Sequence, residues 1–247
     1  MSIAITPRDI YRKMWIDIEL FKKLFHFGKY TVGNNLSSII AKSIDTWMLG
    51  ILISPMAVAA YNPAWKISSL VEVPTGALST YLYPKISFLA SDNQLKKIKE
   101  KVELIIGFNL ALFLPVLIIL YSFAERIIIL FAGTNYIGST HILYITLAYT
   151  LMVPFERHMG VAFNTLGKAK YNLWLSLVRA GLNVVLNYIL IIQLGIVGAA
   201  IATLITYIVG VVISFKLIQQ FLQLDLAVII SFAYKSFHSP IKTAKKI

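Results

Sequence analysis

Apolar runs of about 20 residues recur along the 247-residue chain, separated by short polar or basic segments. A helix of that length crosses the roughly 30 Å hydrocarbon layer of a bilayer. The pattern therefore predicts an all-α integral membrane protein whose six-transmembrane-helix bundle occupies residues 30–219. We expect the spans at residues 30–52, 59–82, 103–123, 140–165, 171–192 and 195–219.

The two segments that flank this bundle are amphipathic and basic. In residues 1–29, Ile10, Met14 and Ile18 share one helical face, with lysines and arginines around it. This pattern is typical of a helix in the membrane interface, although a solvated linker helix has the same pattern. In residues 220–247 a short apolar patch precedes several lysines, and we expect an interfacial helix followed by a basic cytoplasmic tail.

Overall composition agrees with lipid as the solvent. Hydrophobic residues make up 58% of the chain and charged residues only 14%, whereas soluble domains have about one quarter charged residues. The chain has no cysteine, which excludes disulfides, thiol catalysis and cysteine-ligated metals.

The net charge is +12, and most of the lysines and arginines lie in alternate connections between the spans. Eighteen of them lie before the first span, in residues 83–102, in the turn before the fifth span or after residue 215, whereas the alternate connections contain only Arg126. Cytoplasmic connections carry the excess of positive residues. We therefore expect a multi-pass protein of the plasma or inner membrane with both termini in the cytoplasm. This placement explains the basic charge by topology and by anionic lipids, so no nucleic-acid partner is expected.

Four of the six spans carry polar residues at three- and four-residue steps, so each has one polar face. The four rows are Thr31, Asn35, Ser38, Lys42 and Asp45; Asn62, Lys66, Ser69, Glu72 or Val73, Gly76 and Thr80; Thr150, Val153, Arg157, Gly160 and Asn164; and Asn172, Ser176, Arg179, Asn183 and Asn187. Four polar faces of matching period predict a shared interior, which is either a packed polar seam or a water-filled cavity.

Charged residues within these rows bear on that choice, because a charge at mid-bilayer costs roughly 2.5–3.5 kcal/mol or more. Internal ion pairs that only hold the helices together are one interpretation. A cavity for an anionic or polar substrate is the other, and an excess of cations plus amide side chains favours it. The cations are Lys42, Lys66, Arg157 and Arg179, the amides Asn183 and Asn187, and the anions Asp45, Glu72 and Glu156.

Other features of the spans predict local structure. Pro74 and Pro154 predict bends in the second and fourth spans. The third span is apolar apart from Asn109, which predicts a lipid-facing helix, and the connection before it predicts a short amphipathic helix. The sixth span has a face of small residues for close helix contact.

No catalytic arrangement emerges from the sequence. The four histidines lack metal-ligand spacing, and the chain has no glycine-rich phosphate loop. We therefore expect no enzyme activity, no metal site and no cofactor.

Several short stretches, in order, resemble a known family. They are SIDTWMLG at 43–50, VAAYNPAWKIS at 58–68, YPKIS at 83–87, LFAGTNY at 130–136, FNTLGKAK at 163–170 and LNVVLNYILI with GIVGAAIAT within 182–203. Over about residues 20–220 the chain resembles the C-terminal half of polysaccharide and lipid-linked oligosaccharide flippases. These belong to the superfamily that also contains multidrug and toxic compound exporters.

The resemblance implies one half of a two-bundle transporter with twelve or more helices, so the chain is a fragment, a truncated reading frame or a half that pairs with a second six-helix bundle. It implies alternating-access flipping of a polyprenyl-diphosphate-linked oligosaccharide for cell-surface polysaccharide such as O-antigen. The basic residues would attract the diphosphate, Asn183 and Asn187 would contact sugar hydroxyls, and the three acids would act as counter-ions or couple transport to an ion.

Three alternatives remain open at this point. The first is half of a cation-coupled multidrug exporter, for which a net negative cavity is expected. The second is a membrane-embedded glycan-assembly enzyme, which the short outer connections disfavour. The third is a non-transporting remnant.

Overall fold

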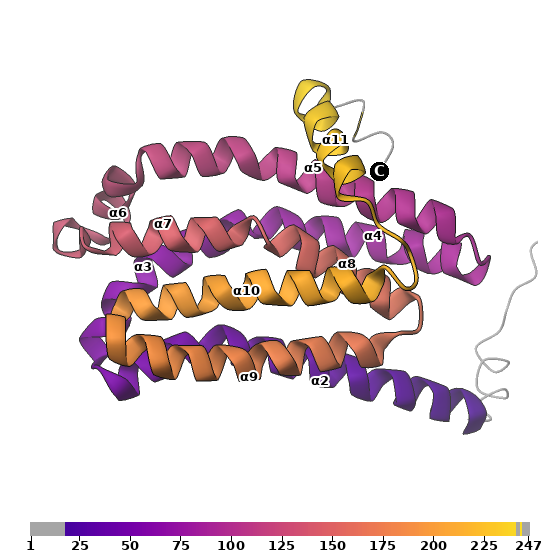
Figure 1. Ribbon diagram of the computed structural model, residues 1–247, viewed down its shortest axis with the longest axis horizontal. Helices are drawn as coiled ribbons and strands as arrows, with labels where there is room; N and C mark the ends of the chain where they lie inside the picture. The colour runs from indigo at the N-terminus through magenta and orange to yellow at the C-terminus, as the bar shows by residue number, and fades with distance from the viewer. Residues whose placement is uncertain (1–17, 241–242, 244–247) are drawn as a thin grey trace, which may run out of the picture.

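The structure, a computed structural model, describes residues 18–240 and 243, without the side chains of several residues in the first helix, Lys42 among them. The expected amphipathic segment before residue 18 and the last lysines of the tail lie outside the described residues. Regular structure in the described part is helical throughout. In Figure 1 most helices lie side by side along one long axis. They are α2 (Ile18–Leu52), α3 (Pro55–Val71), α4 (Val73–Ser91), α5 (Leu95–Ser122), α6 (Ala124–Ala132), the 3-10 helix η1 (Thr134–Tyr136), α7 (Ser139–Thr150), α8 (Val153–Thr165), α9 (Ala169–Leu194), α10 (Ile196–Ile218) and α11 (Leu226–His238).

Within the described residues, α5, α9 and α10 are each long and apolar enough to cross a membrane as one continuous helix. The ranges expected for the second and fourth spans are divided between two helices each, and α2 carries a polar row and several lysines along its length. The six spans therefore stay a prediction. In that prediction, α3 and α4 together would form the second span and α7 and α8 together the fourth, each as two helices placed end to end (Figure 1).

Both of these divisions fall just before a proline. α3 ends at Val71 and α4 begins at Val73, with Pro74 in its first turn. α7 ends at Thr150 and α8 begins at Val153, with Pro154 likewise in its first turn. Proline is tolerated in a first turn because its missing N–H has no helical partner there. At the expected bends the helices are therefore interrupted, although Glu72, Leu151 and Met152 keep right-handed helical backbone angles.

Two of the expected segment boundaries, by contrast, do not coincide with an interruption between helices. α2 runs through residue 30 without a break, so residues 18–29 extend the helix of the first span. α5 likewise joins the expected amphipathic helix of the 83–102 connection to the third span. Neither junction contains a proline. The turn that precedes α5 lies at Asn93, whose φ is +54°.

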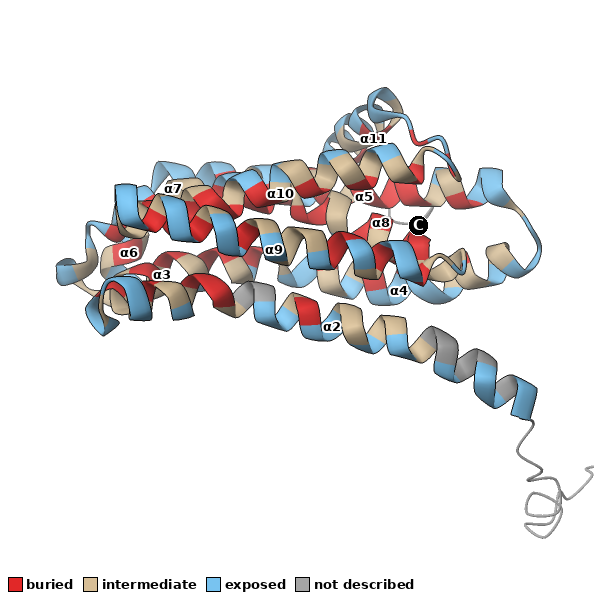
Figure 2. Ribbon diagram, turned by 60° about the horizontal axis from the view of Figure 1, so that its bottom comes forward, coloured by how far each residue is buried: buried red, intermediate tan, exposed pale blue. Residues whose placement is uncertain are grey.

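The apolar interior consists of two clusters at different levels along the bundle. One gathers buried side chains of α4, α5 and α8 with the end of α10 and the start of α11. The other gathers those of α3 and α7 with parts of α5, α6 and α10. Figure 2 shows this interior in red along the inner faces of the helices. The end-to-end pairs thus place α4 and α8 in one cluster and α3 and α7 in the other.

The third span was expected to face lipid, and α5 does expose the apolar side chains of Leu114, Ile118 and Ile119, but its other faces pack against neighbouring helices. Helix α11 packs against it at Gly107, where a Cβ atom would lie 2.6 Å from the carbonyl oxygen of Ile229. On another face Asn109 is fully buried against α4 and α8. The absence of a side chain at Gly107 is what lets the α11 backbone approach this closely.

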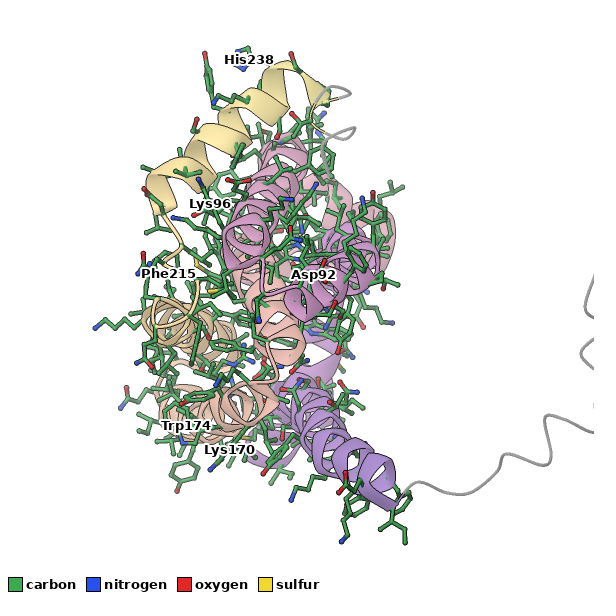
Figure 3. All side chains as sticks on the ribbon, turned by 90° about the vertical axis from the view of Figure 1, so that its right-hand side faces the viewer. Asp92, Lys96, Lys170, Trp174, Phe215 and His238 are labelled. Carbon is green, nitrogen blue, oxygen red and sulfur yellow. The ribbon has the colours of Figure 1, made fainter. Side chains whose placement is uncertain are left out.

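Basic connections gather at one end of the bundle. Figure 3 looks onto that end, where Lys96 at the start of α5 and Lys170 at the start of α9 both lie. The turn between α9 and α10 lies at the opposite end of the long axis in Figure 1, where Gly195 has a φ of +63°. The charge asymmetry of the sequence is therefore an asymmetry between the two ends of the molecule.

Candidate functional site

Two adjoining cavities lie among the polar rows. The Asp45 cavity has a volume of about 120 Å³ and is lined by residues of α2, α3, α4 and α7 to α10. The asparagine cavity, of about 530 Å³, is lined by α2, α4, α8 and α9 and is named for four amide side chains, Asn34, Asn35, Asn164 and Asn172. The two share four lining residues: Ser38, Glu156, Arg157 and Arg179.

Asp45 is the centre of a buried hydrogen-bond network. Its side chain is 5% exposed. The Asn187 amide donates to Asp45 Oδ1 at 2.8 Å, while the hydroxyls of Tyr61 and Thr203 donate to Oδ2 at 2.9 and 2.6 Å. Asn183 completes the network by donating to Thr203 Oγ1 at 3.1 Å. A carboxylate can be buried in this way because several donors replace its lost water.

Further acceptor atoms surround this network. The side-chain oxygens of Asn183, Asn187 and Thr206 are buried and make no hydrogen bond within the described part of the chain. Asn183 and Thr206 also line the Asp45 cavity. The region around the carboxylate is therefore rich in oxygen acceptors, the ligands that a proton donor or a hard cation requires.

An ion pair lies at the boundary of the two cavities. Arg179 of α9 pairs with Glu156 of α8, and both side chains are partly buried. Gly210 of α10 makes room for the arginine, because a Cβ atom there would lie 2.3 Å from Arg179 Cδ. Arg157 lines both cavities and is exposed, in van der Waals reach of the position of Gly76.

The asparagine cavity has its own hydrogen bonds between helices. The Asn172 amide of α9 donates to Asn164 Oδ1 of α8 at 3.2 Å, and the Ser176 hydroxyl donates to Asn34 Oδ1 of α2 at 2.9 Å. These bonds hold amide groups from three helices around one space, in which Arg157 and Arg179 supply positive charge. Such a surface can bind an anionic group and several hydroxyls at once.

The predicted site residues are brought together only in part. Asp45, Glu72, Glu156, Arg157, Arg179 and Asn183 line the Asp45 cavity, and Asn187 lies behind it on Asp45. Lys66 is exposed on α3 and lines neither cavity. The side chain of Lys42 lies outside the described residues. Among the described lining residues, three acids therefore face two arginines, so the expected cation excess is confined to the asparagine cavity.

A second buried polar cluster was missed by the sequence analysis. Asn109 Nδ2 donates to Thr75 Oγ1 at 2.9 Å and lies 3.0 Å from His158 Nε2, while His158 Nδ1 lies 3.3 Å from Ser79 Oγ. Asn109 and His158 are both fully buried. The isolated Asn109 in an apolar span was the available signal, because a lone amide in a membrane helix needs a partner. The partner itself could not be read from the helical period.

Mostly apolar helices that are interrupted beside polar cavities are typical of the helical bundles of membrane transporters. The chain belongs to the MatE family, whose sequence profile matches residues 31–189. The resemblance to the flippase and exporter superfamily is thereby confirmed.

Curated relatives include proteins named as flippases. The chain is 23% identical to the probable low-salt glycan biosynthesis flippase Agl15 of Haloferax volcanii over 82% of its own length and 43% of that protein. It is 25% identical to the probable flippase AglR of the same organism, and 28% identical to a putative O-antigen transporter of Shigella flexneri, over 81% and 74% of this chain. The chain spans less than half the length of each of these relatives.

Solved structures of the same class share the fold. An outward-facing multidrug resistance MATE transporter aligns with a TM-score of 0.74 at 21% identity, over 90% of this chain and 50% of that one. A transporter from Pyrococcus furiosus, described as having a binding pocket of reversed polarity, aligns with a TM-score of 0.67 at 17% identity, over 91% and 53%. The all-α bundle thus corresponds in extent to about half of a transporter fold.

Proposed function

We propose that this chain is the C-terminal bundle of a flippase that moves a polyprenyl-diphosphate-linked oligosaccharide across the plasma or inner membrane by alternating access. The observation that carries the proposal is the asparagine cavity, where Arg157 and Arg179 lie among four amide side chains. The product would serve cell-surface polysaccharide such as O-antigen.

The chemistry of the two substrate parts matches the two kinds of side chain. A guanidinium group binds phosphate oxygens through paired N–H donors, and its charge does not depend on pH. Arg179 is already engaged by Glu156, which leaves the exposed Arg157 as the main contact for the diphosphate. Sugar hydroxyls both donate and accept, as do the amides of Asn164 and Asn172.

A second six-helix bundle is the partner that this arrangement requires. Asn35 and Thr80 line the asparagine cavity from α2 and α4 and are exposed. Polar groups facing hydrocarbon are unfavourable, so another polar surface should cover them in the membrane. The relatives named as flippases are about twice as long as this chain, which supports the same interpretation.

Orientation and driving force follow from charge. The basic end of the bundle would lie in the cytoplasm, where positively charged connections prevail. Asp45, with the acceptor oxygens around it, would bind the coupling proton or cation, while Glu72 and Glu156 tune the cavity or act as counter-ions. Lys42 and Lys66 remain predicted contacts for the diphosphate.

Half of a cation-coupled multidrug exporter is the second candidate. It is favoured by the Asp45 cavity, whose described lining has three acids and two arginines and would attract an organic cation. Its aromatic lining residues Trp65, Tyr149 and Tyr207 would also suit a flat cation.

Binding to the purified chain distinguishes the two. We would titrate it with a soluble chitobiosyl diphosphate ester and with tetraphenylphosphonium, in the wild type, in Arg157→Gln and in the control Arg126→Gln, whose arginine is exposed on α6. We expect the diphosphate to bind and Arg157→Gln to weaken it at least tenfold, consistent with about 1.5–3 kcal/mol for a hydrogen bond to a charged group. Arg126→Gln should have no effect.

Tetraphenylphosphonium binding that Asp45→Asn abolishes, without diphosphate binding, would support the exporter instead. The corresponding measurement in cells is the amount of glycan at the surface when Arg157→Gln replaces the natural residue in the organism's own gene. An unchanged amount would contradict the flippase proposal.

A further inference from the structure

Helix α11 packs on the outside of α5, in the half of the bundle that ends in the basic connections. It runs transversely to the long axis in Figure 1, and in Figure 3, which looks along that axis, it is the yellow helix that ends at His238. α11 is apolar and has 13 residues. At 1.5 Å per residue it is about 20 Å long, too short to cross a hydrocarbon layer of roughly 30 Å. Because α5, α9 and α10 would span the membrane along the long axis, α11 would lie parallel to the membrane plane.

Two contacts fix α11 on α5. The backbone N–H of Asp225, the residue that caps α11, donates to Oε1 of the buried Glu103 at 2.7 Å. Further along, the backbone of α11 lies against Gly107, where a side chain would have no room. Gly107 follows Lys101, the last lysine of α5, by about 9 Å along the helix. With the lysines of α5 at the headgroups, α11 therefore lies at the depth of amphipathic interfacial helices, about 5–10 Å.

The exposed surface of α11 is divided into two rows of side chains. One row is apolar, and its members, which are 48% to 67% exposed, are Leu226, Ile230, Tyr234 and Phe237. The other row is polar, and its exposed members are Ser231, Lys235 and His238. Because successive residues of a helix are rotated by about 100°, the polar row runs beside the apolar row and does not interrupt it. This division fits a helix that lies between hydrocarbon on one side and headgroups on the other.

We infer that α11 lies flat in the membrane interface at the basic end of the bundle, with its apolar row among the acyl chains and its polar row among the headgroups. The sequence predicts an interfacial helix within residues 220–247, and the structure adds its direction, its anchor on α5 and the two rows. Tyrosine is enriched at this depth, and anionic headgroups attract a lysine there, as Tyr234 and Lys235 require. A protein partner fits less well, because covering both rows would bury the lysine.

The leaflet is the one at the basic end, which the proposed orientation makes the cytoplasmic leaflet. The placement of α11 depends on the bundle lying in a membrane but not on what the cavities transport.

Spin labels on single cysteines test this placement, with the purified chain in liposomes of phosphatidylcholine and phosphatidylglycerol. The chain has no cysteine, so an introduced one is the sole site of labelling. Ile230→Cys and Ser231→Cys are a matched pair from the two rows, as are Tyr234→Cys and Lys235→Cys. The measured quantity is the ratio of collisions with dissolved oxygen to collisions with a water-soluble nickel complex. We expect this ratio to be several-fold higher for labels of the apolar row, because oxygen concentrates in hydrocarbon and the nickel complex stays in water.

Two reference positions on α5 set the ends of the scale. Ile118→Cys, exposed in the apolar part of α5, should give the ratio of the hydrocarbon, and Lys97→Cys, exposed near the start of α5, the ratio of water. A ratio like that of Lys97→Cys at every tested position of α11 would overturn the inference, because the helix would then lie in water. A ratio like that of Ile118→Cys at every one would overturn it as well, because both rows would then lie in hydrocarbon.

A third outcome would assign the apolar row to a protein. Labels at Ile230 and Tyr234 that neither reagent reaches would mean that a second bundle or a second copy of the chain covers them. The diphosphate titration of Arg157→Gln reports on the cavities alone, so failure here and failure of the proposed function give different results. Should a labelled variant not fold, Leu226→Cys or Phe237→Cys replaces it on the apolar row and His238→Cys on the polar row, with the same criteria.

Discussion

The bundle contains two buried polar clusters, one built around a carboxylate and the other around a histidine ring. Around Asp45, side chains of α3, α9 and α10 donate to a carboxylate of α2 that also lines a cavity. Around His158, side chains of α4, α5 and α8 pair neutral groups, and the histidine lines neither cavity.

The two clusters differ in the charge of their central group and in the position of that group relative to the cavities. The His158 cluster joins α4, α5 and α8 at the level of one apolar core, so its hydrogen bonds hold helices together. The Asp45 cluster places a charged group and buried acceptor oxygens at a cavity wall. Asp45 itself lies at the wall of a cavity. His158 lines neither cavity, although Thr75 and Ser79 of its cluster line the Asp45 cavity and the asparagine cavity.

Removing the carboxylate should have the largest effect. Asp45→Ala leaves three buried donors without their acceptor, and each unsatisfied group costs about 1–3 kcal/mol, so we expect a loss of about 3 kcal/mol or more. Asp45→Asn keeps the shape, and the hydroxyls of Tyr61 and Thr203 can rotate to accept from the new amide. Thermal unfolding in detergent should place the asparagine variant within about 1 kcal/mol of the wild type. Equal destabilisation by both substitutions would mean that the charge itself holds the cluster.

The neutral cluster should respond in stability alone. His158→Leu removes the ring nitrogens beside Asn109 and Ser79, and we expect a loss of about 2 kcal/mol. Ligand binding to the refolded variant should be unchanged, because the histidine lines neither cavity. The control is the exposed His141→Leu, which should stay within about 0.5 kcal/mol. A binding defect at normal stability would contradict the division between the two clusters.

A smaller effect is expected where the charged region meets α10. Gly210→Ala places a methyl group against Arg179 and should displace it from Glu156 at a cost of about 1–3 kcal/mol. Gly181→Ala, where nothing lies near the added atom, should be neutral or stabilising by up to about 1 kcal/mol.

A double-mutant cycle shows whether this cost passes through the ion pair. Glu156→Gln should change the stability of the Gly210→Ala background less than that of the wild type. Additive effects would show that Gly210 acts on packing alone.

Much of the fold could be predicted from the sequence because helical period and run length act locally. The polar rows of the first, fourth and fifth spans do converge, and Asp45, Arg157 and Arg179 were named from spacing alone. The row of the second span converges only in part: Ser69 and Glu72 line the Asp45 cavity and Gly76 and Thr80 line the asparagine cavity, whereas Lys66 lines neither. The helical period places these residues on one face of their helix, whereas the neighbours that this face meets are set by tertiary packing.

The sequence by itself determined three features: compatibility with lipid, the uneven charge of the connections and the presence of polar helix faces. They depend only on which residues follow one another. Only the tertiary structure decided three others: the pairing of Asn109 with His158, the approach of α11 to Gly107 and the convergence of three donors on Asp45. Each joins residues from different helices, and side-chain periodicity specifies the face of a helix but not the neighbour that it meets.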